Sequence, residues 1–237
     1  MCAVYGAEFV NNTIGHQEEA MKEPIDQYWK KRLTKVKLAL DENNFGAYVA
    51  DNSSQAKQIV MEEIIDKLDI KSVSWGGSMT FVATGIYEAV RDSSRIEVLD
   101  VFGKTLPQDE INQIRRNALL VDLYITGTNA VTESGQLVNL DMYGNRVAAI
   151  TFGPRYVIIL VGRNKIVSDL ATAMARIKNY AAPVNAMRLN KKTPCAHSSY
   201  CEDCKSPERI CNTWTISEKS FPKGRIKVVL INEDLGF

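Results

Sequence analysis

The chain has 237 residues, of which 45% are hydrophobic and 24% charged, and its net charge is +1. This balance excludes a disordered chain and provides no overall positive field for holding nucleic acid. No basic region precedes an apolar stretch near residue 1, and the apolar run 156–162 is far shorter than a membrane span. We therefore expect a cytoplasmic protein whose partners include neither nucleic acid nor a membrane.

The first half of the chain alternates between short apolar runs and segments with helical periodicity. In the first helix, apolar residues recur three or four positions apart and Pro24 occupies the first turn. Strands are expected at 46–50, 72–75 and 96–99, and helices at 24–40, 59–68, 79–90 and from Pro107 onward. This order predicts an α/β protein with a mixed, largely parallel sheet and helices on both faces.

The middle of the chain contains strand-like runs separated by short turns. These runs cover residues 121–126, 130–132, 136–140, 147–152 and 156–161. Ser134 with Gly135, and residues 143–145, have the composition of hairpin turns. We expect hairpins here, so that the sheet becomes mixed.

A further helix is predicted over 168–180, with Ser168 as its N-cap and Pro183 ending it. Its inward-facing residues are expected to be Leu170, Ala173, Met174 and Ile177, and a last strand is expected at 225–232. The predicted organisation is an N-terminal extension (1–23), an α/β domain (24–190), a cysteine-rich metal-binding segment (191–214) and a C-terminal strand that returns to the domain (215–237).

Four of the five cysteines lie in one short segment. They are Cys195, Cys201, Cys204 and Cys211, separated by five, two and six residues. Thiolates are good ligands for iron and zinc, and one close pair flanked by single cysteines is nearer to cluster ligation than to the paired pattern of structural zinc sites. The spacing favours a [4Fe-4S] cluster, with zinc, and disulfides or unbound thiols, as the alternatives.

Two other segments are candidates for binding and catalysis. Gly76, Gly77 and Ser78 form a turn between a strand and a helix, where backbone N–H groups can hold a phosphate or carboxylate, or where Ser78 simply caps the helix. Glu133 at a strand end can act as a nucleophile or a general base, and Arg146, which follows Asn145, can clamp an organic acid. The alternative for this second segment is a solvated hairpin tip.

Five segments together resemble the LUD, or lactate-utilisation, domain proteins. They are WGGSMT (75–80), DLYITGTNAVTESGQLVNL (122–140), YGNRVAAITFGP (143–154), VIILVGRNK (157–165) and TPCAHSSYCEDCKSPERICN (193–212). The resemblance implies a fold like that of ribose-phosphate isomerases and CoA transferases. Glu133–Gly135 resembles the turn that carries the catalytic glutamate of CoA transferases.

Some LUD proteins are associated with the oxidation of lactate to pyruvate together with iron-sulfur partner subunits. The resemblance thus implies a role in organic-acid utilisation, redox-linked through the cysteines, with an iron-sulfur or electron-transfer protein as a partner. The ligand is expected to be a small organic acid or its activated ester, held by Gly76–Ser78, Asn145 and Arg146 in one pocket with Glu133. The rival hypotheses are an acyl- or CoA-transferase that uses Glu133 and a noncatalytic regulatory subunit that contains zinc.

Overall fold

The computed structural model describes residues 5–100, 102 and 105–237, and the side chains from residue 23 onward. The strands are β1 (Gly46–Ala50), β2 (Ser72–Trp75), β3 (Glu97–Leu99), β4 (Leu123–Gly127), β5 (Ala130–Thr132), β6 (Leu137–Asp141), β7 (Tyr156–Gly162), β8 (Ile166–Val167), β9 (Thr213–Ser217) and β10 (Ile226–Ile231). The helices are α1 (Tyr5–Glu42), α2 (Ser53–Gln58), η1 (Ile59–Ile64), η2 (Ile65–Lys67), α3 (Met79–Ala83), α4 (Ile86–Arg91), α5 (Gln108–Asn117), α6 (Asn145–Thr151), η3 (Arg163–Lys165), α7 (Leu170–Arg176), η4 (Ile177–Ala181), α8 (Ala182–Arg188) and α9 (Pro194–Ser198).

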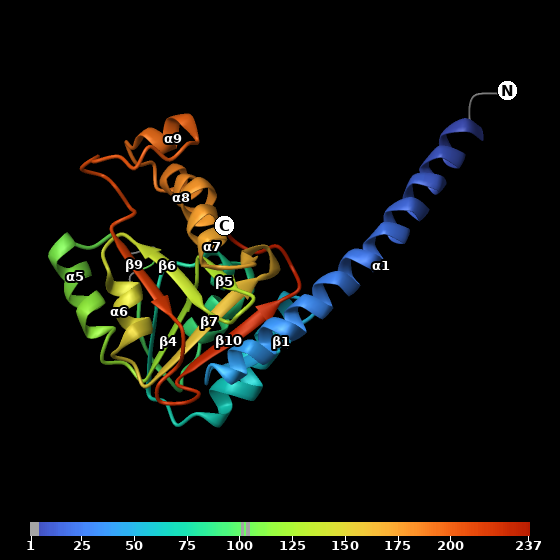
Figure 1. Ribbon diagram of the computed structural model, residues 1–237. Helices are drawn as coiled ribbons and strands as arrows, with labels where there is room; N and C mark the ends of the chain where they lie inside the picture. Colours follow the sequence, from blue (N-terminus) through green and yellow to red (C-terminus); the bar gives the residue numbers. More distant parts are fainter. Residues whose placement is uncertain (1–4, 101, 103–104) are drawn as a thin grey trace.

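Six strands form a parallel sheet in the order β1-β10-β7-β4-β2-β3. Its central strands are almost entirely buried, because helices cover both faces. The α/β class and the largely parallel sheet predicted from the sequence are therefore confirmed. The strand at the C-terminal end, β10, lies inside this sheet between β1 and β7 (Figure 1).

Side chains alternate between the two faces of the main sheet. On β7, Val157 and Ile159 point into the core that α1 and α6 cover, whereas Ile158 and Leu160 point into the core under η1, α3 and α4. The predicted helix at 79–90 is divided into α3 and α4 at Gly85, whose φ of +65° is left-handed. Helices that follow neighbouring strands thus lie on opposite faces of one sheet.

A second, smaller sheet has the order β8-β5-β6-β9. In it, β6 pairs antiparallel with β5 and with β9, a strand that the sequence analysis did not predict. The turn Ser134–Gly135 between β5 and β6 is confirmed, and the left-handed φ of Gly135, +83°, explains the glycine. The antiparallel pairing expected from the hairpins therefore lies in this second sheet, and the six-stranded sheet stays parallel.

The predicted strand at 147–152 is wrong, because these residues form most of α6. Val147, Ala149 and Ile150 are buried on the inner side of that helix. A short apolar run suits a buried helical turn as well as a strand, so hydrophobicity alone does not separate the two. The predicted hairpin turn at 143–145 instead leads from β6 into α6 through Gly144, with a φ of +87°.

Pro24 was predicted to begin a helix and Pro183 to end one, and both predictions are wrong. Pro24 lies inside α1, whose amino-terminal part extends away from the sheets (Figure 1). Pro183 lies in the first turn of α8, and the π-helical stretch η4 immediately before it accommodates the missing N–H. The N-cap of α7 is Asp169 instead of Ser168, and Met174 is 38% exposed, whereas Ala173 and Ile177 are buried as expected.

None of the described helices combines the length and apolar character that crossing a membrane requires.

Candidate functional site

A cavity of about 490 Å³ opens at the carboxyl ends of β2 and β4. Its wall includes Trp75 at the end of β2, Gly127 at the end of β4, and Lys165 after β7. The helix after β2 packs on one face of the main sheet and the helix after β4 on the other, so this is a topological switch point. Ligands of open parallel sheets bind in such crevices.

The glycine turn lies at the cavity, and its two glycines have different roles. Gly76 is buried, and a Cβ there would lie 2.9 Å from Arg146 Cγ and from Tyr124 Oη, so this glycine permits close packing. Gly77 is exposed, and a Cβ on it would meet nothing within 4 Å. Ser78 caps α3 by accepting a hydrogen bond from the Phe81 N–H.

Because α3 has only five residues, its dipole adds little to anion binding. The part of the turn that faces a ligand is therefore the open backbone at Gly77 and the Ser78 hydroxyl.

Arg146 lines the cavity but is fully engaged by the protein itself. Its Nε donates to Asp141 Oδ1 at 2.9 Å, and its Nη atoms donate to Asn139 Oδ1, to Asn129 Oδ1 and to two backbone carbonyls. These five bonds use every N–H of the guanidinium. The prediction that Arg146 clamps an organic acid is corrected, because the side chain instead holds β4, β6 and α6 together.

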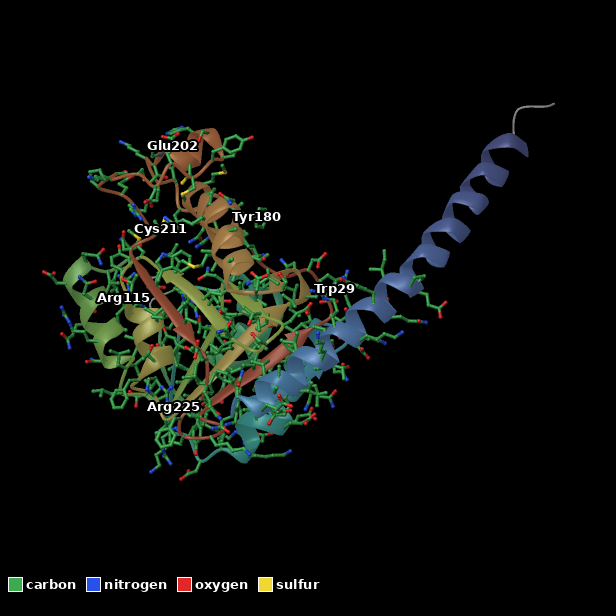
Figure 2. All side chains as sticks on the ribbon, in the orientation of Figure 1. Trp29, Arg115, Tyr180, Glu202, Cys211 and Arg225 are labelled. Carbon is green, nitrogen blue, oxygen red and sulfur yellow. The ribbon has the colours of Figure 1, made fainter. Side chains whose placement is uncertain are left out.

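Asn145 and Tyr143 lie at the cavity beside the start of α6. Asn145 is half-buried and lines the cavity. The Arg115 guanidinium lies over the Tyr143 ring, 4.3 Å from its centroid, and carries its charge to the cavity wall from α5. Figure 2 places Arg115 on the side of α5 next to the second sheet.

Lys165 also lines the cavity, although it was not among the site residues predicted from the sequence. Its side chain is buried, and Nζ donates to Thr80 Oγ1 at 2.8 Å. None of the ion pairs found in the described part of the chain includes this ammonium. Burial, together with the smaller effect of the charges of Arg176 and Arg146, lowers the pKa of Lys165 to about 7.

The charged side chains that line the cavity are mostly cationic. They are Arg115, Arg146, Lys165 and Arg188, against the carboxylate of Asp141, among the lining residues that the structure describes. Asp141 is already paired with Arg146. The remaining cations give the cavity a positive potential, which attracts anions.

Glu133 does not line this cavity. It lies at the turn between β5 and β6, where its carboxylate pairs with Arg32 and, at 3.4 Å, with Lys35, both on α1. The expectation of one pocket that contains Glu133 together with the glycine turn is therefore wrong. The opposite end of β6, at Leu140 and Asp141, lines the cavity instead.

The four cysteines lie on α9 and in the loop that follows. Cys195 is buried, the other three are half-buried, and all four are free thiols. Burial raises the pKa of Cys211, and the nearby Cys195 and Cys201 also raise it, whereas Lys178 and Arg209 act in the opposite direction. Figure 2 shows Cys211 where the chain leaves this segment towards β9.

This segment suits iron or zinc in the kind of its donor atoms. Four thiols are ligands of the type that both metals prefer. Among the residues with described side chains, no three from Cys, His, Asp and Glu converge closely enough to hold a metal ion.

Fold and cavity together define an α/β protein with a cationic cavity at the switch point of a parallel sheet. The family model of the LUD domain matches residues 33–231, well over half of the chain. The chain therefore belongs to the LUD domain family. The matched range includes the cysteine segment and β10, and the division of the chain into four parts stays a prediction.

None of the curated proteins compared with the chain matches it. Among solved structures, the chain is similar to the crystal structure, at 1.70 Å resolution, of a DUF162 family protein from Deinococcus radiodurans. The TM-score is 0.49 at 11% sequence identity, and the similarity covers 86% of this chain and 98% of that chain.

The sequence contains a signal that points to Lys165. The apolar run 157–161 is buried in β7, and the polar residues Arg163, Asn164 and Lys165 follow it directly before another buried strand. A lysine between two buried strands at the carboxyl edge of a parallel sheet is a candidate for the site. Its burial depends on Thr80 and on the segment 235–236, which are far away in the sequence.

Proposed function

We propose that this LUD-family protein acts in organic-acid utilisation and binds a small organic anion in the cavity between β2 and β4. The observation that carries the proposal is the charge of the side chains in the wall: Arg115, Lys165 and Arg188 have no side-chain carboxylate among the described lining residues to neutralise them, since Asp141 pairs with Arg146. A carboxylate is the group that such a wall attracts.

The depth of the cavity strengthens this attraction. Lys165 is only 5% exposed, and a charge there interacts with a ligand in a medium of lower dielectric constant than water. Ser78 adds a hydroxyl whose hydrogen is available, because its oxygen accepts from the Phe81 N–H. These groups support binding of the acidic end of a ligand.

Another part of the wall is apolar and favours an organic over an inorganic anion. Trp75, Val82, Leu99 and Phe102 line it, and the Trp75 indole is held by a hydrogen bond from Nε1 to Asp100 Oδ1 at 2.8 Å. Small carboxylic acids such as lactate and pyruvate combine an anionic group with a short carbon chain, which suits such a lining.

Calorimetric titration with L-lactate, pyruvate and the uncharged lactamide tests this proposal. We expect both acids to bind and lactamide to bind at least tenfold more weakly. Arg115→Gln removes a lining charge and is expected to weaken binding of the acids several-fold. Arg116→Gln, a neighbouring exposed residue outside the cavity wall, is the matched control and is expected to leave Kd unchanged. Equal binding of lactate and lactamide would contradict the proposal.

We also propose that the cysteine segment takes up a soft metal, a [4Fe-4S] cluster in first place and zinc as the alternative. The support is the set of four free thiols within residues 195–211, three of which are near enough to influence one another electrostatically. A cluster would link the protein to a redox partner, whereas zinc would be redox-inert. The transferase alternative, with Glu133 as the nucleophile, has less support because Glu133 lies outside the cavity.

Anaerobic purification with iron, sulfide and zinc analysis, together with visible and electron paramagnetic resonance spectra, tests the metal proposal. We expect iron and sulfide with broad visible absorption, and their loss in Cys204→Ala. Zinc without colour would support the alternative, a regulatory or structural role. Retention of the same metal by Cys204→Ala would contradict the assignment of Cys204 as a ligand, and absence of both metals would contradict the proposal.

A further inference from the structure

We propose that the Lys165 amine is a nucleophile that forms an imine with the carbonyl group of a small 2-oxo acid bound in the cavity. This inference rests on the proposed function, because the acid must first bind to the cationic wall. It adds a covalent step and narrows the ligand class to acids that carry a ketone or aldehyde group.

The position of the Lys165 amine is fixed by its neighbours. Nζ donates to Thr80 Oγ1 at 2.8 Å, and the Thr80 hydroxyl in turn donates to the Leu235 carbonyl at 3.0 Å. Asn164, next to Lys165 in η3, bonds the same C-terminal segment through the Leu235 N–H and the Gly236 carbonyl, both at 3.1 Å. The amine is therefore held at the cavity wall on a short turn directly after the central strand β7.

Lys165 differs from an ordinary buried lysine because no acid is paired with it within the described residues. The charged side chains that influence it most are Arg176 from α7 and Arg146 from α6, both of which disfavour the ammonium form. The one side-chain carboxylate of the described cavity wall, Asp141, is bound to Arg146. With a pKa of about 7, a large fraction of the amine is uncharged at neutral pH and available as a nucleophile.

The proposed step is an ordinary condensation and needs no oxidant or reductant. The nitrogen lone pair of Lys165 attacks the carbonyl carbon, the C=O π electrons move to oxygen, and a proton passes from nitrogen to that oxygen to give a carbinolamine. The nitrogen lone pair then forms the C=N bond as the C–O bond breaks, and the hydroxyl group leaves as water with the remaining proton of the nitrogen, which gives the imine. The cavity hydroxyls of Ser78 and Tyr124 are available to donate to the oxygen, since burial raises the pKa of Tyr124 and keeps it protonated.

Reductive trapping of the full-length protein tests the inference. The protein is incubated with pyruvate and sodium cyanoborohydride, and the modified residue is located by peptide mass spectrometry. We expect one pyruvate-derived group per chain, attached at Lys165, and a trapping rate that rises with pH up to about 7 and then levels off, because only the free amine attacks. Lys165→Arg keeps a positive charge without this nucleophile and is expected to lose the label.

Lys227 is the internal control for lysine reactivity as such. Burial lowers the pKa of Lys227 too, but this side chain bonds the Gly224 carbonyl, lies over the Tyr156 ring and does not line the cavity. Labelling of Lys227 or of surface lysines to the same extent as Lys165 would overturn the inference. So would the absence of label at Lys165 under conditions in which calorimetry detects pyruvate binding, and in that case the anion-binding proposal would stand alone. Absence of both binding and label would remove both proposals.

Discussion

Arg146 and Asp141 form a buried ion pair, with 2.9 Å between Nε and Oδ1, that joins the start of α6 to the end of β6. Both side chains are about 10% exposed. The pair lies at the inner wall of the cavity and, through the other hydrogen bonds of Arg146, connects the parallel sheet to the second sheet. It therefore supports the architecture of the site, and all the N–H groups of Arg146 are used within the protein.

Arg146→Met is expected to lower the free energy of unfolding by about 3 kcal/mol or more, because it leaves the Asp141 carboxylate buried without its partner. Chemical denaturation monitored by circular dichroism measures this change. Arg188→Met, at an exposed position, is the control and is expected to change stability by less than about 0.5 kcal/mol. Similar stability of the two variants would contradict the structural role of Arg146.

Gly76→Ala is expected to destabilise the protein by about 1–3 kcal/mol, because the new methyl group would lie 2.9 Å from Thr126 Oγ1, Tyr124 Oη and Arg146 Cγ. Gly77→Ala places a methyl group where nothing lies within 4 Å, so its stability should match that of the wild type to within about 0.5 kcal/mol. Thermal unfolding of both variants gives the comparison. Equal stability of the two alanine variants would show that Gly76 is not required for packing.

The parallel sheet could be predicted from the sequence because its strands are local apolar runs followed by helical periodicity. The strands at 46–50, 72–75 and 156–161 are in place to within a residue. Residues 147–152 were not predictable in this way. The helix α6 is buried and has only seven residues, which is too short for its apolar residues to repeat with a helical period.

The site was predicted only in part, because tertiary contacts decide what each polar residue does. Arg146 has the composition of an anion clamp, yet its partners Asn129, Asn139 and Asp141 occupy it fully. The Glu133 carboxylate forms an ion pair with Arg32, which lies about one hundred residues earlier in the chain, and this pairing is outside the cavity wall. No local pattern contains such pairings.

Glu133→Gln is expected to leave the Kd for lactate and pyruvate unchanged, because Glu133 lies outside the cavity wall. Its stability should fall by less than about 1 kcal/mol, since the ion pairs with Arg32 and Lys35 are partly exposed. Calorimetry and thermal unfolding of the same sample measure both quantities. A tenfold loss of affinity would instead place Glu133 in the site, in agreement with the transferase hypothesis.

Lys165→Met is expected to stabilise the protein at neutral and acidic pH, because a charged amine buried without an acid is replaced by an apolar side chain. The pKa of Lys165 has its ordinary value of 10.5 in the unfolded chain and is about 7 in the folded protein. Between these values unfolding takes up a proton, so wild-type stability rises with pH from about 7 to about 10. The cost of burying the charge is complete below pH 7 and vanishes above about 10.5.

The variant should therefore exceed the wild type by at least about 1 kcal/mol at pH 6, since one pKa unit corresponds to about 1.4 kcal/mol, and by progressively less as the pH rises. Denaturation curves at several pH values measure the difference. Lys227→Met, at a less buried lysine outside the cavity, is the control and should change less with pH. A Lys165→Met variant that is less stable than the wild type at pH 6 would mean that an acid partner compensates the ammonium, and would remove the basis for its nucleophilic form.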